Sequence, residues 1–369
     1  MALRDLAALL NGPQTIGRGT GFWSMAVLVV VLAAIYPLYA EPFAVANTAY
    51  FGVWVFMALG LGLLWGYGGM LSFGQTAFFG LSGYAYGVMA INFGAAHSYP
   101  LLALILALAI GTAFAALLGY FMIYGGINGV FVGIVTLSVT LAFATFMNQT
   151  AGPEWRIGRA RLNGYNGMTR IPSLSIDWFD GHRIKFDGAN FYYLVLVLLV
   201  VTYLALRVLV NSRFGNVLVA SRENPERAEL LGYAIRRYQL AAFAIGGFLA
   251  SLSGALYAAW GNFIVPASMA LPAAAMPIIW VAVGGRQDVT ATLIGTFVVL
   301  YAFQMLTVVS QQYALIAIGA LLVVTVLVAP GGYVLWVVDV ASRLRPRADV
   351  RSDAAADVEI RLREGTHGG

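Results

Sequence analysis

Three long stretches of this chain contain no charged side chain at all. No Asp, Glu, Lys or Arg occurs in Pro42–Pro153, in Tyr238–Gly285 or in Val289–Val338. A water-exposed surface cannot be built from such stretches, because exposed apolar patches of that size associate. Only 10% of the chain is charged, against about 25% in soluble domains. The sequence therefore predicts an integral membrane protein.

A helix that spans a membrane needs about 20 apolar residues. The expected fold is an all-α, polytopic transmembrane bundle of about eight to ten spans. Pro272 and Pro277 interrupt the eighth candidate, so we expect a short, broken or re-entrant segment there. The candidate spans are Trp23–Ala40, Phe43–Tyr67, Leu71–Phe93, Tyr99–Tyr124, Val130–Gln149, Phe191–Val210, Tyr238–Gly261, Leu271–Gly284, Val289–Val309 and Tyr313–Ala329.

Arginine placement predicts the orientation. Residues 1–22, 211–237 and 339–369 are basic, and an even number of predicted spans separates them. The positive-inside rule makes these three segments cytoplasmic, so residues 23–338 form the membrane domain between two cytoplasmic tails. The tail after Asp339 has no apolar period and is expected to be solvated and partly disordered. Residues 150–190 then form a periplasmic loop, which we expect to fold as a small translocated unit despite its basic residues.

Several function classes find no support in the sequence. The chain has no cysteine, and His97, His182 and His367 all lie outside the predicted spans. No acid lies in a span, and we expect neither a catalytic site, nor a metal site, nor a fixed counter-ion in the membrane. The formal charge of +5 is explained by topology-setting arginines rather than by nucleic-acid binding. The chain lacks the P-loop pattern Gly-x4-Gly-Lys-Ser/Thr and is expected to bind no cofactor itself.

The loop at residues 211–237 predicts a short helix with a cap at each end. Asn224 is a favoured N-cap residue, and Pro225 suits the first helical position. Glu226 follows in the first turn, where an acidic side chain complements the helix dipole. Gly232 is placed to end the helix in the left-handed conformation. The prediction is a helix of about two turns between two spans.

One face of this short helix suits contact with another protein. Ala228 and Leu231 are three residues apart and share a side, while Glu223 and Arg227 are four apart. The alternative is an ordinary charged loop with one stray helical turn. Caps at both ends favour a rigid helix that docks in a groove of a partner protein.

A glycine-rich segment, Gly66–Val88, contains the polar residues Ser72 and Gln75. Small residues allow close helix packing in membranes, and buried amides or hydroxyls bond between helices. The alternative interpretation is a polar translocation pathway beside an interrupted helix. Ser72, Gln75, Thr136 and Asn148 are the candidates for that pathway.

The predicted outer loop contains the stretch "LNGYNGMTRIP". Gly164, Asn166 and Gly167 are typical turn-forming residues. The alternative is that these residues contact a ligand or a partner outside the membrane.

Four stretches resemble one family in the same order along the chain. "SRFGNVLVASRENPERAELLGY" resembles the coupling region of ABC importer permeases of the LivM type. "GYGGMLSFGQTAFFGLSGYAYGV" and "GVFVGIVTLSVTLAF" resemble the family's third and fifth spans, and "GGFLASLSGALYAAWGNFIVPASM" with "IIWVAVGGRQDVTATLIG" resembles its later spans. The resemblance covers residues 50–330. At Met276 the family often carries a glutamate, so no role of that glutamate can be carried over.

The resemblance implies a permease subunit in a bacterial inner membrane. Its expected partners are a second permease of the LivH type, two ATP-binding subunits of the LivG and LivF type, and a periplasmic solute-binding protein. ATP and Mg²⁺ would be used by the partner ATPases, which would act on Glu223, Asn224, Pro225, Glu226, Arg227, Ala228, Leu231 and Gly232. The expected solute is neutral or zwitterionic, with branched-chain or other amino acids first and urea or a short amide as the alternative. An ATPase-independent secondary transporter or channel is a further alternative.

Overall fold

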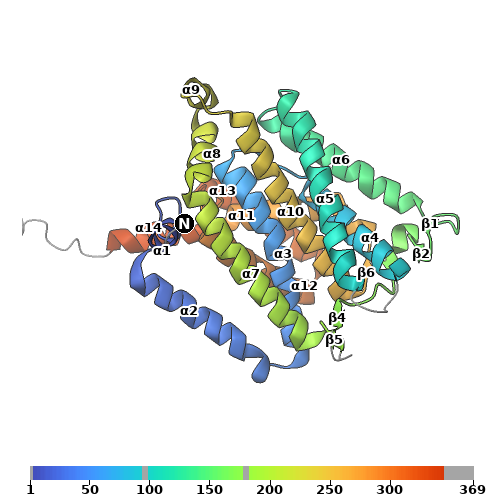
Figure 1. Ribbon diagram of the computed structural model, residues 1–369. Coiled ribbons are helices and arrows are strands. Elements are labelled where there is room, and N and C mark those ends of the chain that lie inside the picture. Colours follow the sequence, from blue (N-terminus) through green and yellow to red (C-terminus); the bar gives the residue numbers. More distant parts are fainter. Residues whose placement is uncertain (1–2, 94–98, 178–182, 345–369) are drawn as a thin grey trace, which may run out of the picture.

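The computed structural model describes residues 3–93, 99–177 and 183–344. It is a bundle of helices with short strands at one end (Figure 1). The α-helices are α1 (Leu3–Leu10), α2 (Gly19–Ile35), α3 (Pro42–Leu61), α4 (Gln75–Phe93), α5 (Tyr99–Tyr124), α6 (Val130–Gln149), α7 (Gly188–Asn211), α8 (Arg213–Glu223), α9 (Pro225–Leu230), α10 (Ile235–Gly261), α11 (Leu271–Gly284), α12 (Val289–Val309), α13 (Gln311–Val328) and α14 (Tyr333–Leu344). A π-helix, η2 (Gly62–Tyr67), extends α3.

Each of the ten predicted spans overlaps a helix, although α4 begins four residues after the predicted start of its span. Within the described residues, seven helices are long and apolar enough to cross a membrane, or eight if the bent pair α13 and α14 is one span. The pair meets at an angle of 42°. Helix α4 is not among the helices that are apolar enough to cross a membrane by this measure, and it carries several glycines and polar residues. Helix α11 has only 14 residues, so it is shorter than the hydrocarbon layer. The all-α, polytopic fold predicted from the sequence is confirmed.

Helices α3, α4 and α10 form the centre of the bundle. Over its most apolar stretch, α3 has 83% of its residues buried and α10 has 72% buried. The same share is 28% in each of α5, α7 and α12. Glycines allow the central helices to approach closely. A side chain at Gly60 would lie 2.7 Å from the carbonyl oxygen of Gly246, and one at Gly254 would lie 1.9 Å from that of Phe79. This close packing at glycines explains how most of the surface of α3 and α10 is buried inside the bundle.

The two ends of the bundle differ. At one end, here called the α9 face, lie α8 and α9 (Figure 1). Hydrogen bonds place the N-terminal segment there, because Gln14 bonds to Asn216 of α8 and Ile16 bonds to Asp288 at the start of α12. At the other, here called the loop face, short antiparallel ladders form. Strand β1 (Arg156–Ile157) pairs with β2 (Ala160–Arg161), β3 (Met168–Thr169) with β6 (Phe263–Ile264), and β4 (Ser175–Asp177) with β5 (Arg183–Lys185). The long loop between α6 and α7 therefore forms short ladders, one of which anchors it to the end of α10.

Both predicted tails contain helical residues. Residues 1–22 contain α1 and the first turn of α2, and the segment between them is bonded to the bundle. The C-terminal tail was expected to begin at Asp339, but α14 continues to Leu344. Residues 339–344 of that tail are therefore helical, and residues 345–369, on which the expectation of partial disorder mainly falls, lie outside the described part of the chain.

Candidate functional site

Helices α8 and α9 form a capped elbow between α7 and α10. The Ser212 hydroxyl accepts a hydrogen bond from the Phe214 N–H at 3.2 Å and caps α8. The Asn224 side-chain oxygen accepts from the Arg227 N–H at 2.9 Å and caps α9. Gly232 has φ +85°, and its N–H donates to the Glu229 carbonyl at 2.8 Å. Both predicted ends of the short helix are confirmed; α8 was not predicted.

The predicted docking face is wrong at one residue. Ala228 is only 2% exposed, because it packs the short helix onto the rest of the chain. Leu230 and Leu231 are instead 87% and 76% exposed. Two adjacent leucines in water are costly unless something covers them. Leu230 and Leu231 therefore form the exposed apolar surface of α9, and Ala228 lies on the buried side of the helix.

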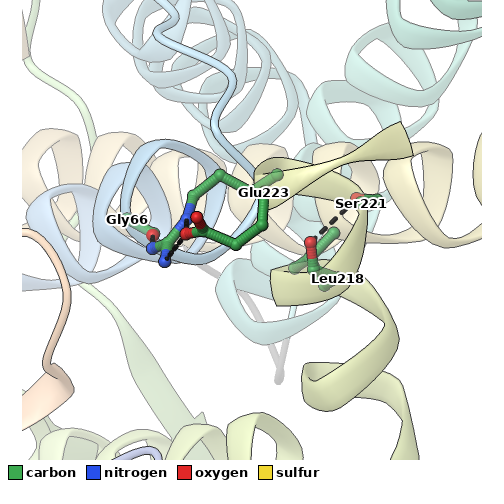
Figure 2. A network of polar contacts seen from close by, with 5 residues as sticks. Gly66, Leu218, Ser221 and Glu223 are labelled. Carbon is green, nitrogen blue, oxygen red and sulfur yellow. Dashed lines mark hydrogen bonds and ion pairs between the residues drawn. The ribbon is translucent and has the colours of Figure 1, made fainter. Parts of the chain in front are cut away.

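Arg222 connects this elbow to the centre of the bundle. Its guanidinium donates to the Gly66 carbonyl at the end of η2, and its Nε donates to the Glu223 carboxylate at 3.0 Å. Figure 2 shows this network around Gly66 and Glu223. A side chain at Gly69 would lie 2.8 Å from the Arg222 side chain. The end of α8 is thus attached to the point where the helical chain of α3 and η2 stops.

Between η2 and α4 the backbone is not helical, at residues 68–74. Threonines of α6 hold this break. The Thr136 hydroxyl accepts from the Phe73 N–H at 3.0 Å, and the Thr140 hydroxyl donates to the Phe73 carbonyl at 3.1 Å. The Ser72 hydroxyl accepts from the Gly74 N–H at 3.1 Å. The predicted interruption is present, and Ser72 and Thr136 serve to fix its backbone.

The other two pathway candidates differ from each other. Gln75 begins α4 and is 1% exposed. Within the described residues, neither its side-chain oxygen nor its nitrogen has a hydrogen-bond partner. Such a group is costly in the interior unless water or a ligand reaches it. Asn148 is exposed near the far end of α6, about 18 Å along that helix from Thr136. The structure brings Ser72, Gln75 and Thr136 together and leaves Asn148 apart.

The glycines of the loop between α6 and α7 act as turn residues. Gly164 and Gly167 have φ +54° and +76°. A side chain at Gly167 would lie 2.2 Å from the Ile264 carbonyl oxygen, on the neighbouring strand β6. Asn166 lies between them and is exposed. The prediction that these residues form turns is confirmed.

A buried charge was missed by the sequence reasoning. Arg207 lies inside the predicted span Phe191–Val210 and is 0% exposed. It donates to the carbonyls of Leu10 and Gly17 and, at 2.7 Å, to the Tyr203 hydroxyl. Its guanidinium lies 4.6 Å from the centre of the Phe22 ring. The expectation that no fixed charge lies in a span is wrong at this position. A lone arginine in an apolar helix was the available signal.

Arg207 is one of several side chains that hold residues 10–18, here called the N-terminal strap. Asn211 accepts from the Gln14 N–H at 2.9 Å, and Asp288 accepts from the Ile16 N–H at 2.6 Å. Asp288 also caps α12 through the Ala291 N–H at 2.8 Å. Burial raises the pKa of the Asp288 carboxyl, although these N–H donors and Arg207 act in the opposite direction. The strap therefore ties α7 to the start of α12 on the α9 face.

Comparison with known proteins identifies the family. Residues 43–326 match the model of a family described as "Branched-chain amino acid transport system / permease component". The chain belongs to this family. The resemblance seen in the sequence is thereby confirmed, and this permease is a multi-pass membrane protein that serves transport.

One relative of the permease carries a more specific description. It is the "Probable branched-chain amino acid transport permease protein LivM" of Methanocaldococcus jannaschii. The two chains are 24% identical over 276 residues, which are 67% of this chain and 76% of the relative. No solved structure matches the permease.

Proposed function

We propose that this permease is the membrane subunit of an ATP-driven ABC importer for a small neutral or zwitterionic solute, with branched-chain or other amino acids first. Membership of the permease family supports a translocation role rather than catalysis. The chain has no P-loop, so ATP and Mg²⁺ would be bound by two partner ATPases. A second, LivH-type permease and a periplasmic solute-binding protein complete the proposed assembly.

The single observation that carries the proposal is the exposed leucine pair of α9. Leu230 and Leu231 project from a helix that is capped by Asn224 and seated on Ala228. Glu226 and Arg227, also exposed, flank the pair. A rigid, apolar projection with a charged rim fits a groove in another protein better than it fits water. An ATPase that changes conformation on nucleotide binding would bind α9 and displace it as a rigid unit.

Arg222 gives this displacement a route into the membrane domain. It joins the end of α8 to Gly66, and residues 68–74 lead from there to Gln75. A non-helical segment in a membrane bundle is a natural hinge, since its backbone bonds are few. Movement of α9 would therefore act first on this break and on the threonines of α6 that hold it.

The same proposal fixes the orientation. ATPases act in the cytoplasm, so the α9 face would be cytoplasmic and the loop face would be periplasmic. The arginines of residues 211–237 agree with this assignment under the positive-inside rule. The N-terminal strap is bonded to the α9 face, so the N-terminus would also be cytoplasmic in a bacterial inner membrane.

A coupling experiment tests the proposal. The importer is purified with its ATPases and solute-binding protein, placed in proteoliposomes, and assayed for leucine uptake and ATP hydrolysis. The double variant Leu230→Asp, Leu231→Asp should abolish ATP-driven uptake, because carboxylates cannot enter an apolar groove without a large desolvation cost. The matched control is Leu230→Met, Leu231→Met, which keeps both side chains apolar and of similar size and should retain ATP-driven uptake.

Two results would count against the proposal. Uptake that continues without nucleotide would favour a secondary transporter or channel. Full ATP-driven uptake in the leucine-pair variant would show that α9 does not transmit the work. A wild-type importer that carries urea and no amino acid would leave the ABC assignment intact and change the solute.

A further inference from the structure

A polar cavity of about 460 Å³ lies beside the N-terminal strap, where α8, the start of α12 and α14 meet it. Its volume falls within the range of small-molecule sites, about 300–1,000 Å³. Basic and amide side chains line it from three elements, namely Arg18 of the strap, Arg222 of α8 and Gln287 before α12. Leu335 and Val338, three residues apart on one side of α14, supply an apolar wall. The lining thus combines hydrogen-bond donors with a surface that suits a hydrocarbon chain.

Hydrogen bonds fix the strap along this cavity. The Tyr67 hydroxyl donates to the Gln14 carbonyl at 3.0 Å, and the Ile16 N–H donates to the Asp288 carboxylate at 2.6 Å. The Gln14 side chain also donates to the side-chain oxygen of Asn216 at 3.3 Å. The walls are therefore in place before a ligand enters, and preformed walls reduce the entropy cost of binding.

Most of the donors in the cavity are unused. Within the part of the chain that the structure describes, Arg18 makes no hydrogen bond and no ion pair, so its five N–H groups are available. The exposed amide of Gln287 has no partner there either. Arg222 uses three N–H groups on Gly66 and Glu223, which leaves two. Guanidinium groups with open N–H pairs match the geometry of phosphate oxygens.

The carboxylate among the lining residues does not cancel this positive charge. Asp288 is 2% exposed, and its two oxygens accept from the N–H groups of Ile16 and Ala291. Arg207 adds a favourable charge interaction with the same carboxylate. The charge of Asp288 is therefore balanced by groups of the protein, whereas Arg18 has no such counter-charge. An anion is the ligand whose charge complements this cavity.

Arg18 lies at the edge of the hydrocarbon layer. It directly precedes the apolar stretch Gly19–Leu38, which has 20 residues. That is the length of helix that crosses the hydrocarbon, so the residue before it lies at the level of the lipid headgroups. Trp336 of α14 is 49% exposed, as is typical of an indole at the membrane–water interface. The cavity therefore lies at the depth where phospholipid phosphates are found.

We propose that this cavity binds the phosphate group of an anionic membrane phospholipid. The N–H groups of Arg18, Arg222 and Gln287 hold the phosphate oxygens, and an acyl chain passes along Leu335 and Val338. A bound lipid thereby links the strap to the end of α8. A free phosphate ion shares the headgroup chemistry but cannot gain from the apolar wall. The inference does not need the ATPase partnership, so it is tested separately from the proposed function.

Native mass spectrometry of the full-length permease in detergent tests the site. Delipidated protein is titrated with phosphatidylglycerol, with phosphatidylcholine and with inorganic phosphate, and phosphatidylglycerol should bind most tightly. Arg18→Gln should weaken that binding about fivefold or more, the loss expected for one basic side chain at a lipid headgroup. Gln287→Glu should weaken it too, because the new carboxylate repels the phosphate. Arg236→Gln is the matched control, since Arg236 is exposed on α10 and does not line the cavity, and it should bind as the wild type does.

Thiol protection locates the lipid. The chain contains no cysteine, so Gln287→Cys gives one thiol at the cavity and Arg236→Cys gives one outside it. In nanodiscs, replacing part of the phosphatidylcholine by phosphatidylglycerol should slow maleimide labelling of Gln287→Cys and leave Arg236→Cys unchanged. Equal lipid binding by the wild type and Arg18→Gln, inorganic phosphate binding as tightly as phosphatidylglycerol, unchanged labelling of Gln287→Cys, or an acidic partner protein retained there in place of lipid would overturn the proposal.

Discussion

Replacing Arg207 with methionine should release the N-terminal strap. Methionine fills a similar apolar volume but removes all five N–H donors of the guanidinium. The Tyr203 and Thr290 hydroxyls lie 2.8 Å apart and can still bond to each other. The carbonyls of Leu10 and Gly17 lose the donor that Arg207 supplies. The strap should therefore open more often, while the membrane helices stay folded.

The size of this effect follows from those two carbonyls. A hydrogen bond to a charged donor contributes about 1.5–3 kcal/mol, so these two partly buried bonds together would contribute about 3–6 kcal/mol. Burial of the guanidinium itself carries a desolvation cost that methionine avoids. We expect a net loss of about 2–4 kcal/mol in the free energy of strap opening. At 1.4 kcal/mol per factor of ten, this corresponds to about 30- to 700-fold faster opening-limited exchange.

Amide hydrogen exchange measures the strap directly. The N–H groups of Gln14 and Ile16 are held by Asn211 and Asp288, so they should exchange faster in Arg207→Met. Arg213→Met is the matched control, because Arg213 is exposed and lies 5.6 Å above the Tyr233 ring. The control should stay within about 0.5 kcal/mol of the wild type. Unchanged exchange at Gln14 and Ile16 in Arg207→Met would refute the role given to this side chain.

Three further predictions concern single positions. Asn224→Ala should weaken α9 by about 1 kcal/mol and speed exchange of the Arg227 N–H about fivefold, whereas Asn224→Asp keeps the acceptor and should stay near wild type; equal exchange in the two variants would contradict the cap. Gly66→Ala should prevent accumulation of folded protein, because the new methyl carbon would lie 1.5 Å from the Arg286 carbonyl oxygen. Gly319→Ala meets nothing within 4 Å and should behave as wild type in size-exclusion chromatography. The raised pKa of Asp288 means that the native state holds the carboxyl proton more tightly than the unfolded state does. The contribution of this proton to stability is therefore complete in acid and is lost as pH rises through the native pKa. Thermal melts across the acidic range should show this loss of stability in the wild type and a smaller pH slope in Asp288→Asn.

The ends of α9 were predictable because they depend on neighbouring residues. Asn224 caps through an N–H three residues away, and Gly232 ends the helix by its own conformation. The inward side of Ala228 was not predictable, since it depends on how α8 and α10 place the helix. Small size at that position was compatible with either a docking surface or a packed base.

The strap depends on contacts between distant parts of the chain. Arg207 and Leu10 are separated by 197 positions, and no local pattern records such a pair. Asn148 was proposed for the pathway from its polarity, but its position along α6 removes it from the other candidates.

The central claim is that a partner ATPase binds α9 through the exposed Leu230 and Leu231. Because the chain has no cysteine, Leu230→Cys provides a single thiol for cross-linking to subunits of the native membrane assembly. Mass spectrometry should identify the cross-linked product as an ATPase that carries a P-loop, and Val197→Cys, exposed on α7, should give no such product. Failure to capture any nucleotide-binding subunit from an assembly that retains ATP-driven uptake would contradict the account.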